Sequence, residues 1–296
     1  MWVMPAQGHE GVDDSLNSAL TYANGNHVYE LSTAERAAIH TVYKLYDAML
    51  GQPHEGLKPA ALDAARPFLY SAYDQIQIGG RLAALRAHLL ASVDSCPYCG
   101  FGEPRDLDHY LPRSQYGELA IYPNNLIPSC APCNNAKRTV VPGLGTAHGP
   151  GLIHPYYQDL PDLDFLKADI VFENGSLSVS FRIENTGIDP DLATKLQFQL
   201  DRLKLNGRYP KQINKFINEQ RTAILMFKGL GVEVLSDYLQ RNAASLAGSF
   251  HRNDWRVALL RGLAEAPDFC QAPETYLGPE ADFQEPGVTH SADPTT

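Results

Sequence analysis

Four of the five cysteines form two pairs in which two residues separate the partners. Cys96 and Cys99 make the first pair, and Cys130 and Cys133 make the second pair, after thirty intervening residues. Two such pairs supply four thiolates on two short turns, and four sulfurs in a tetrahedron are the usual ligands of structural Zn²⁺. The alternatives are unrelated buried thiols or two disulfides, but the repeated two-residue spacing favours zinc. We therefore expect a closed structural zinc site that holds the segment between the pairs.

The net charge of the chain limits how it can bind a nucleic acid. Its net charge is −10, from 24 Lys and Arg against 34 Asp and Glu. A protein that coats nucleic acid without sequence preference needs an excess of basic residues, so contact with phosphates must depend on local charge. The sequence has no run of eighteen apolar residues and no stretch typical of a signal peptide. We therefore expect a cytoplasmic protein with no membrane partner.

The part of the chain before the cysteine pairs is expected to be helical from residue 31 to residue 93. Residues 1–30 are rich in Gly, Asn, Ser and Asp, which predicts a weakly ordered lead-in. Ser32 and Glu35 then form an S-x-x-E capping box at the start of a helix. Its buried face is predicted to contain Ile39, Val42, Tyr43, Tyr46 and Leu50. Further helical patterns cover 60–76, with a break at Pro67, and 81–93, with a stripe of Leu82, Leu85, Leu89 and Leu90.

A segment rich in glycine and proline, 141–151, predicts a linker and a boundary before the C-terminal region 152–268. Within that region, residues 168–183 alternate apolar and polar side chains around Asn174-Gly175, which predicts a β-hairpin. Helical patterns follow over 191–227, divided by Gly207 and Pro210, and over 232–247 and 254–264. Few large apolar residues occur in 271–296, which predicts a disordered acidic tail.

Three short motifs lie between and around the cysteine pairs, in the order DLDHYLP (106–112), NNLIP (124–128) and CAPCNNAK (130–137). Each motif alone is weak, but together, inside the zinc spacing, they resemble the HNH (His-Me finger) endonuclease family. That family has an Asp-His pair followed by a hydrophobic residue and a proline, an asparagine before a leucine, and a closing Cys-x-x-Cys-His/Asn-x-x-Lys. The resemblance covers about forty residues, and Asn134 stands where the founding pattern has histidine.

The resemblance implies a ββα-metal fold for the module at 94–142. Its first strand would pass through Asp108 and His109, its second strand would lie near Leu126, and its helix would start at Cys133. A unit of this size cannot build a large apolar core, so zinc would supply folding energy. The complete chain is therefore expected to be α+β: a ββα-metal HNH module with a four-cysteine zinc site, embedded in a mainly helical protein with one β-hairpin and helices in its C-terminal half.

The resemblance also implies roles for individual residues in the hydrolysis of a phosphodiester bond. His109 would be the general base, because a neutral imidazole can accept a proton from water near neutral pH. Asp108 and Asn134 would ligate a catalytic Mg²⁺ or Mn²⁺, or Ni²⁺. Independently of the resemblance, Asp106 lies two residues before Asp108 on the same strand face and is a candidate accessory ligand of lower rank. Asn125 would complete the catalytic set as an organiser that holds the loop and orients the base. Lys137 and Arg138 are candidates for phosphate contact.

A second candidate contact surface lies outside the module, at 191–228. Eight basic residues occur there against three acidic ones. One hypothesis is that the helices present a basic stripe, including Lys211 and Lys215, to a phosphate backbone; the alternative is a solvated helix face. No partner is visible in the sequence for the remaining candidates, which we treat as core or turn residues: His154, Tyr156, Tyr157, Trp255 and Cys270.

The resulting hypothesis is a metal-dependent HNH endonuclease that cuts DNA and, by resemblance, leaves 5′-phosphate ends. RNA stays open as a substrate. The alternative is a non-catalytic zinc-dependent nucleic-acid-binding protein. A standalone module of this kind suggests restriction or phage defence, with a homodimer or a partner subunit of a defence system.

Overall fold

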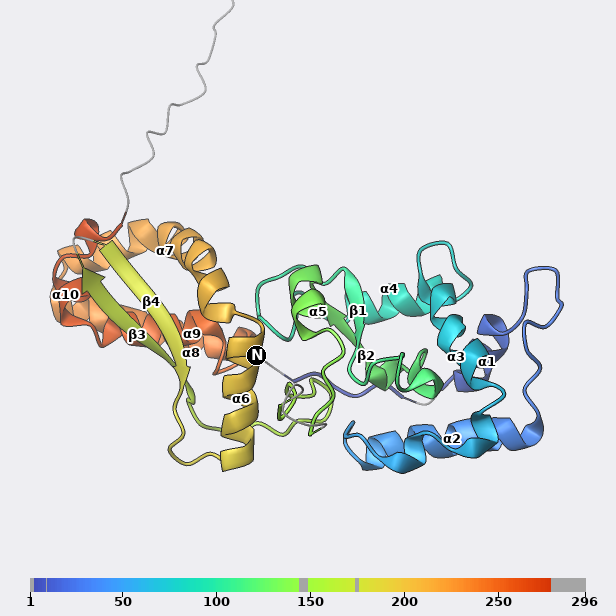
Figure 1. Ribbon diagram of the computed structural model, residues 1–296. Coiled ribbons are helices and arrows are strands. Elements are labelled where there is room, and N and C mark those ends of the chain that lie inside the picture. Colours follow the sequence, from blue (N-terminus) through green and yellow to red (C-terminus); the bar gives the residue numbers. More distant parts are fainter. Residues whose placement is uncertain (1–2, 9, 144–148, 174–175, 278–296) are drawn as a thin grey trace, which may run out of the picture.

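A computed structural model describes residues 3–8, 10–143, 149–173 and 176–277. Its elements form three groups side by side along an elongated molecule (Figure 1). The helices that precede the cysteine pairs lie at one end, a small ββα unit lies in the middle, and the C-terminal helices with a two-stranded sheet lie at the other end. Within the described part of the chain, no helix is long and apolar enough to cross a membrane.

The N-terminal group consists of short helices around α2 (Thr33–Ala48). The predicted capping box is present: the Ser32 hydroxyl accepts from the Glu35 amide (3.2 Å), and the Glu35 carboxylate accepts from the Ser32 amide (2.8 Å). The predicted stripe is buried except for Leu50, which lies beyond the end of the helix and is 55% exposed. The other elements of this group are α1 (Val12–Ala19), η1 (Glu55–Leu57), η2 (Ala60–Leu62), α3 (Arg66–Ala72), η3 (Tyr73–Ile76) and α4 (Ala83–Ala91).

Two expectations for this group are wrong. The weakly ordered lead-in contains α1, which buries Val12, Leu16 and Ala19 at helical spacing. This helix is only eight residues long, so its periodicity is too short to stand out among the surrounding polar residues. Pro67 is the second residue of α3 and does not break a helix, because the first turn of a helix leaves its amides unpaired and tolerates proline.

The middle of the molecule is the ββα unit. Strands β1 (Asp106–His109) and β2 (Leu126–Ser129) pair antiparallel, with His109 opposite Leu126 and Asp108 opposite Ile127. Between them the chain forms two short 3₁₀ turns, η4 (Gly117–Leu119) and η5 (Pro123–Asn125). Helix α5 (Ala131–Lys137) follows β2 directly and starts two residues earlier than predicted. The expected ββα arrangement is therefore confirmed.

The C-terminal group packs a hairpin against helices. Strands β3 (Leu166–Glu173) and β4 (Ser176–Ile183) pair antiparallel as predicted, and the Asn174-Gly175 turn lies outside the described residues. Gly262 allows close packing on this sheet, because a Cβ there would lie 3.0 Å from the Ala168 carbonyl oxygen. The helices are α6 (Pro190–Arg202), α7 (Leu205–Gly229), α8 (Val232–Ser249), α9 (Trp255–Ala264) and α10 (Pro267–Gln271), followed by η6 (Pro273–Thr275).

Two boundaries in this group differ from the predicted ones. Gly207 and Pro210 lie inside α7, and the chain breaks earlier, at Lys204, whose φ of 51° is in the left-handed region. The predicted disordered tail starts too early, because η6 is ordered and Leu277 is buried. The remainder of that tail, 278–296, lies outside the described residues.

The C-terminal helices hold the turn that contains the first cysteine pair. Gln199 of α6 donates to the Tyr98 carbonyl (3.0 Å) and accepts from the Ile153 amide (3.1 Å). Tyr209 and Trp255 donate to the carbonyl oxygens of Cys99 and Gly100, both at 3.3 Å. Residues on both sides of the predicted linker are buried in the same core, so among the described residues this segment does not separate two cores.

Candidate active site and metal centre

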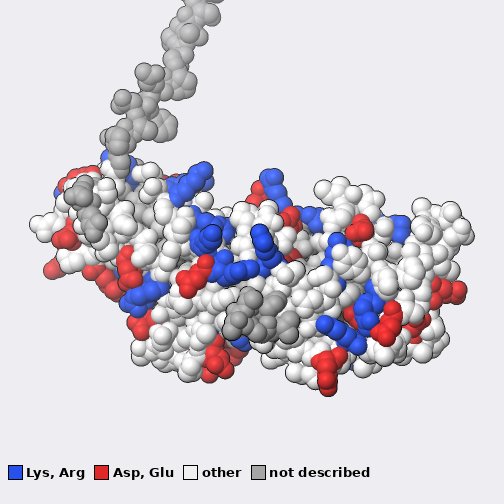
Figure 2. Space-filling model, viewed as in Figure 1, with Lys and Arg blue, Asp and Glu red and all other residues white. Residues whose placement is uncertain are grey.

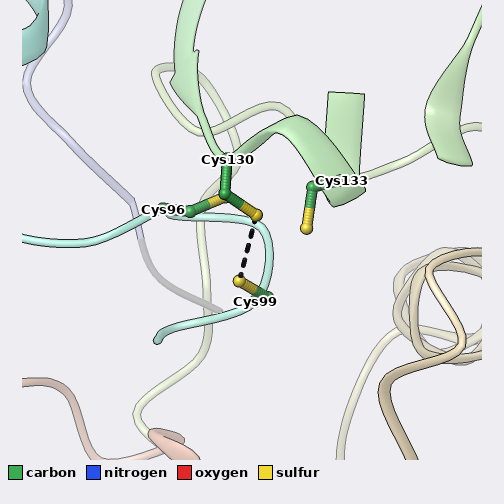
Figure 3. A group of neighbouring side chains, drawn as sticks. All are labelled: Cys96, Cys99, Cys130 and Cys133. Carbon is green, nitrogen blue, oxygen red and sulfur yellow. Dashed lines mark hydrogen bonds between the residues drawn. The ribbon is translucent and has the colours of Figure 1, made fainter. Parts of the chain in front are cut away.

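The four cysteines of the two pairs converge on one point. Their sulfur atoms all lie within 4.8 Å of one another, and all four residues are buried and free of disulfides. Figure 3 shows two of them on the loop before β1 and two at the start of α5. The sulfurs of Cys99 and Cys130 are 3.8 Å apart, close to the separation of about 3.8 Å that tetrahedral Zn–S bonds of ~2.3 Å require. The residues present therefore fit a structural zinc ion.

Two further residues complete the surroundings of the sulfurs. Gly102 donates its amide to the Cys99 sulfur (3.3 Å), and a Cβ at this glycine would lie 2.6 Å from the Cys130 sulfur. Arg208 of α7 places its guanidinium 3.2 Å from the Cys133 sulfur and 3.5 Å from the Cys130 sulfur. Four thiolates around one Zn²⁺ carry net negative charge, which the guanidinium offsets in part.

The position of Arg208 corrects part of the predicted basic stripe. Its side chain faces the cysteines and does not point to solvent, and Lys228 is paired with Glu274 (3.4 Å). Lys211 and Lys215 are exposed on α7, the latter 3.8 Å from Glu219. Figure 2 shows Lys and Arg side chains gathered near the middle of one face of the molecule.

His109 lies at the end of β1 with a fixed tautomer. Its Nε2 is 2.9 Å from the Ala120 carbonyl oxygen, which can only accept, so Nε2 carries the proton and Nδ1 carries the lone pair. The ring of Tyr73 packs edge-on against the imidazole, with centroids 4.4 Å apart. Burial, together with the charges of Arg113 and Lys137, lowers the pKa of His109 to about 3. The imidazole is therefore neutral at physiological pH.

Asp108 points into the module and forms a buried ion pair. Its carboxylate is 3.0 Å from the Lys137 ammonium and accepts from the Tyr98 hydroxyl (2.8 Å). Burial raises the pKa of Asp108, and the Lys137 charge opposes this in part. Lys137 is 1% exposed and also donates to the His109 carbonyl (2.7 Å). This placement differs from the predicted phosphate contact, because a side chain so enclosed does not reach the surface.

Asn134 on α5 contacts the other aspartate of β1. Its amide nitrogen donates to Asp106 (3.2 Å), which places the accessory candidate beside Asn134. Of the predicted residues, Asp108, His109, Asn134 and Arg138 line one open cleft of about 310 Å³. The residues that line it are Tyr70, Tyr73, Leu107, Asp108, His109, Pro112, Arg113, Ser114, Asn134, Arg138 and Thr139.

A catalytic cation would find oxygen donors in this cleft. Carboxylate and amide oxygens are the ligands that Mg²⁺ and Mn²⁺ prefer, and Asp108 and Asn134 carry such groups, although the Asp108 carboxylate is bound to Lys137 and Tyr98. Among the described residues, however, the cysteines make up the one group of three or more Cys, His, Asp or Glu ligands close enough to share an ion. A cation in the cleft would therefore need oxygens from water or substrate as well.

Asn125 holds the loop that follows His109 and does not line the cleft. Its side chain accepts from the Leu111 amide (2.8 Å) and donates to the carbonyl oxygens of Leu111 (3.0 Å) and Leu119 (3.2 Å). Both ends of the loop between β1 and η4 are thus fixed to one buried amide. The side chain lies where an organiser of this loop is expected.

Two residues behind Asn125 make contacts that the sequence did not predict, although Tyr46 was expected on a buried helix face and His154 as a core or turn residue. The Tyr46 hydroxyl of α2 donates to the Asn125 side-chain oxygen Oδ1 (3.0 Å) and accepts from His154 Nε2 (2.9 Å). His154 Nδ1 accepts from the Tyr156 amide (3.2 Å). Gly51 permits this packing, because it has a φ of 73° and a Cβ there would lie 2.2 Å from the His154 ring. Tyr46 and His154 are separated by 108 in sequence number, which explains why no local pattern revealed this network.

Replacing one ligand of the cluster tests the zinc site. We expect Cys99→Ser to lose bound zinc and to lower the free energy of unfolding by several kcal/mol, because metal binding is coupled to folding in such modules. Zinc per chain by atomic emission and thermal unfolding with and without chelator measure both effects. The matched control is Cys270→Ser, a buried cysteine outside the cluster, which should keep its zinc. Equal zinc content in both variants would contradict the assignment.

The buried neutral His154 predicts a loss of stability in acid. Burial holds the pKa of His154 well below its usual range. Below about pH 6.5 the unfolded chain takes up a proton that the folded chain does not, so each further pH unit costs about 1.4 kcal/mol.

The measurement is the difference in free energy of unfolding between pH 7.5 and pH 5.5. We expect this loss to be smaller in His154→Gln than in wild type by about 1.4 kcal/mol, while His88→Gln at an exposed position behaves as wild type. The comparison cancels the pH dependence of zinc binding. Identical losses in all three proteins would show that His154 does not contribute.

Comparison with known proteins identifies the segment that contains this site. Residues 96–139 match the family model described as HNH endonuclease. A similar protein is "Protein ea31" of Escherichia phage lambda, which is 39% identical over 69 residues, 23% of each chain. The chain therefore spans about a quarter of the length of this relative, and no solved structure matches it. The segment from Cys96 to Thr139, with its four-cysteine cluster, is an HNH endonuclease domain.

Proposed function

We propose that this protein is a metal-dependent endonuclease that hydrolyses phosphodiester bonds in DNA, with His109 as general base. The observation that carries the proposal is the state of His109 in the cleft. Its imidazole is neutral, its Nε2–H is bound to the Ala120 carbonyl, and it shares the cleft with Asp108 and Asn134. This combination supplies an oriented base beside oxygen ligands for a cation.

The chemistry assigned to His109 follows from its tautomer. Nδ1 would accept a proton from water as the water oxygen attacks phosphorus, and the Ala120 carbonyl would stabilise the imidazolium through its bond to Nε2–H. Asn125 is a positioning residue, because it binds the loop and touches no group in the cleft. The base is thus held by backbone contacts that do not depend on substrate.

Asp108 and Asn134 would hold Mg²⁺, Mn²⁺ or Ni²⁺, with Asp106 beside Asn134 as an accessory ligand. When bound, the cation supplies positive charge that stabilises the phosphoryl oxygens and the leaving oxygen. Lys137 and Tyr98 fix the Asp108 carboxylate from behind. Arg138, exposed at the end of α5, lines the cleft and is placed for contact with a phosphate.

One observation favours a second candidate, a zinc-dependent nucleic-acid-binding protein without catalysis. The Asp108 carboxylate already contacts an internal ammonium, which could take the place of a cation. The biological role that we propose for a catalytic protein is restriction or phage defence, in which a homodimer or a partner subunit would allow both strands to be cut.

A substitution at the base separates the two candidates. We expect wild type to nick or cut plasmid DNA with Mg²⁺, Mn²⁺ or Ni²⁺, and we expect His109→Ala to be slower by about 100-fold or more, because general-base catalysis contributes ~10²–10⁴-fold. The control is His88→Ala, an exposed histidine of α4. Both variants should keep wild-type zinc content. Equal cutting by wild type and His109→Ala, or cutting by neither while DNA still binds, would contradict the mechanism.

The exposed lysines of α7 are proposed to contact the DNA backbone outside the cleft. The double variant Lys211→Glu/Lys215→Glu should bind a 30-base-pair duplex more weakly, and its salt dependence should be shallower by about two counterions. Lys44→Glu, an exposed lysine of α2, controls for a change in net charge. If the double variant had the same affinity and the same salt dependence as wild type, the lysines would belong to a solvated helix face that does not contact DNA.

A further inference from the structure

One wall of the cleft is aromatic and comes from outside the HNH domain. Tyr70 of α3 and Tyr73 of η3 precede the domain in sequence, and both line the cleft beside His109. Arg113, from the loop after β1, lies over both rings, at 4.5 Å from the Tyr70 centroid and 4.9 Å from the Tyr73 centroid. A guanidinium and two aromatic rings therefore form one stack next to the candidate base.

The inner part of this stack is fixed. The Tyr73 hydroxyl donates to the Leu107 carbonyl (2.8 Å), and its ring contacts the His109 imidazole. Tyr73 thus fixes the position of the stack relative to His109, because its ring contacts both the His109 imidazole and the Arg113 guanidinium.

The outer part of the stack is open. Arg113 covers Tyr70 from one side, yet Tyr70 remains 40% exposed at the rim of the cleft. The ion-pair partner of Arg113 is Asp74 (3.2 Å), whose side chain is 65% exposed. A surface pair of this kind contributes little free energy, so a phosphate could replace Asp74 at low cost. The rim offers a cation and an aromatic ring to an incoming ligand.

An arginine beside an exposed aromatic ring fits a nucleotide whose base is unpaired. Arginine binds phosphate through paired N–H groups, and an exposed aromatic ring stacks on a base whatever its identity. In a closed duplex the base faces are covered by neighbouring bases, so an exposed ring can use only a base that has left the stack.

We propose that Tyr70 and Arg113 form a subsite for one unpaired nucleotide next to the scissile phosphate, with Arg113 on its phosphate and Tyr70 against its base. The inference rests on the proposed nuclease function and narrows its substrate class. The preferred substrate is DNA that is single-stranded or locally unpaired at the cleavage position, in preference to a continuous duplex.

Binding tests the subsite without requiring cleavage. The full-length, zinc-loaded His109→Ala protein is titrated with a duplex that carries one unpaired 2-aminopurine, and with the same duplex fully paired. We expect tighter binding of the unpaired substrate and quenching of its fluorescence by stacking. Adding Tyr70→Ala should weaken binding of the unpaired substrate by about tenfold and remove the quenching, with less than about a twofold effect on the paired duplex.

Two matched variants test whether the aromatic ring of Tyr70 is what binds the unpaired base. Tyr70→Phe keeps an aromatic ring and should retain tight binding and quenching. Tyr22→Ala removes an exposed tyrosine outside the cleft and should change neither. The proposal would be overturned if the Tyr70→Ala variant bound both substrates as tightly as its parent, or if its affinity for both fell by the same factor. A parent protein that binds no DNA would overturn it too.

Cleavage by the otherwise wild-type chain separates the two proposals. If it cuts both substrates equally and Tyr70→Ala changes neither rate, the subsite is wrong and the nuclease function stands. If it cuts neither substrate while the binding and quenching pattern is as expected, the nuclease function is wrong and the subsite stands.

Discussion

The arrangement of the middle of the molecule depends on the convergence of four sulfurs. The strands of the ββα unit have four residues each and its helix has seven, lengths that are marginal for isolated elements in water. A zinc ion bound by the two cysteine pairs would tie the start of this unit to the beginning of its helix. Helices α6, α7 and α9 then pack on the same turn through Gln199, Tyr209 and Trp255, so the C-terminal group is built around the cluster.

The cleft residues are held from behind by buried polar groups. Lys137 binds both the side chain of Asp108 and the carbonyl of His109, which are adjacent on β1. On the other side, Asn125 binds the loop after β1 and is itself held by Tyr46 and His154. Buried groups of this kind are costly if unpaired, so each contact limits the movement of its neighbour. The result is a rigid support from three distant parts of the chain beneath an open cleft.

The sequence predicted best what depends on local spacing. The capping box of α2, the cysteine pairs and the β3–β4 pairing follow from neighbouring residues and are confirmed. The ββα order, which the resemblance to the HNH family implied, is confirmed as well. The sequence-based predictions failed where a contact between residues far apart in the chain determines the position of a side chain. Charge alone suggested that Arg208 faces solvent, whereas folding brings it to the cysteine sulfurs, and nothing near His154 indicates that it binds Tyr46. The catalytic roles of Asp108, His109 and Asn134 stay predictions, because geometry places these residues in one cleft without testing what they do.

The contacts of Asn125 have a consequence for how such a protein can diversify. Within the loop, the Asn125 side chain binds main-chain atoms of Leu111 and Leu119, so these bonds do not depend on which side chains the loop carries. Arg113 and Ser114, which line the cleft, lie between these anchor points. Their replacement would leave these main-chain bonds in place. Under the proposed function, single replacements in this loop would therefore alter target preference while Asn125 keeps the same hold on its backbone.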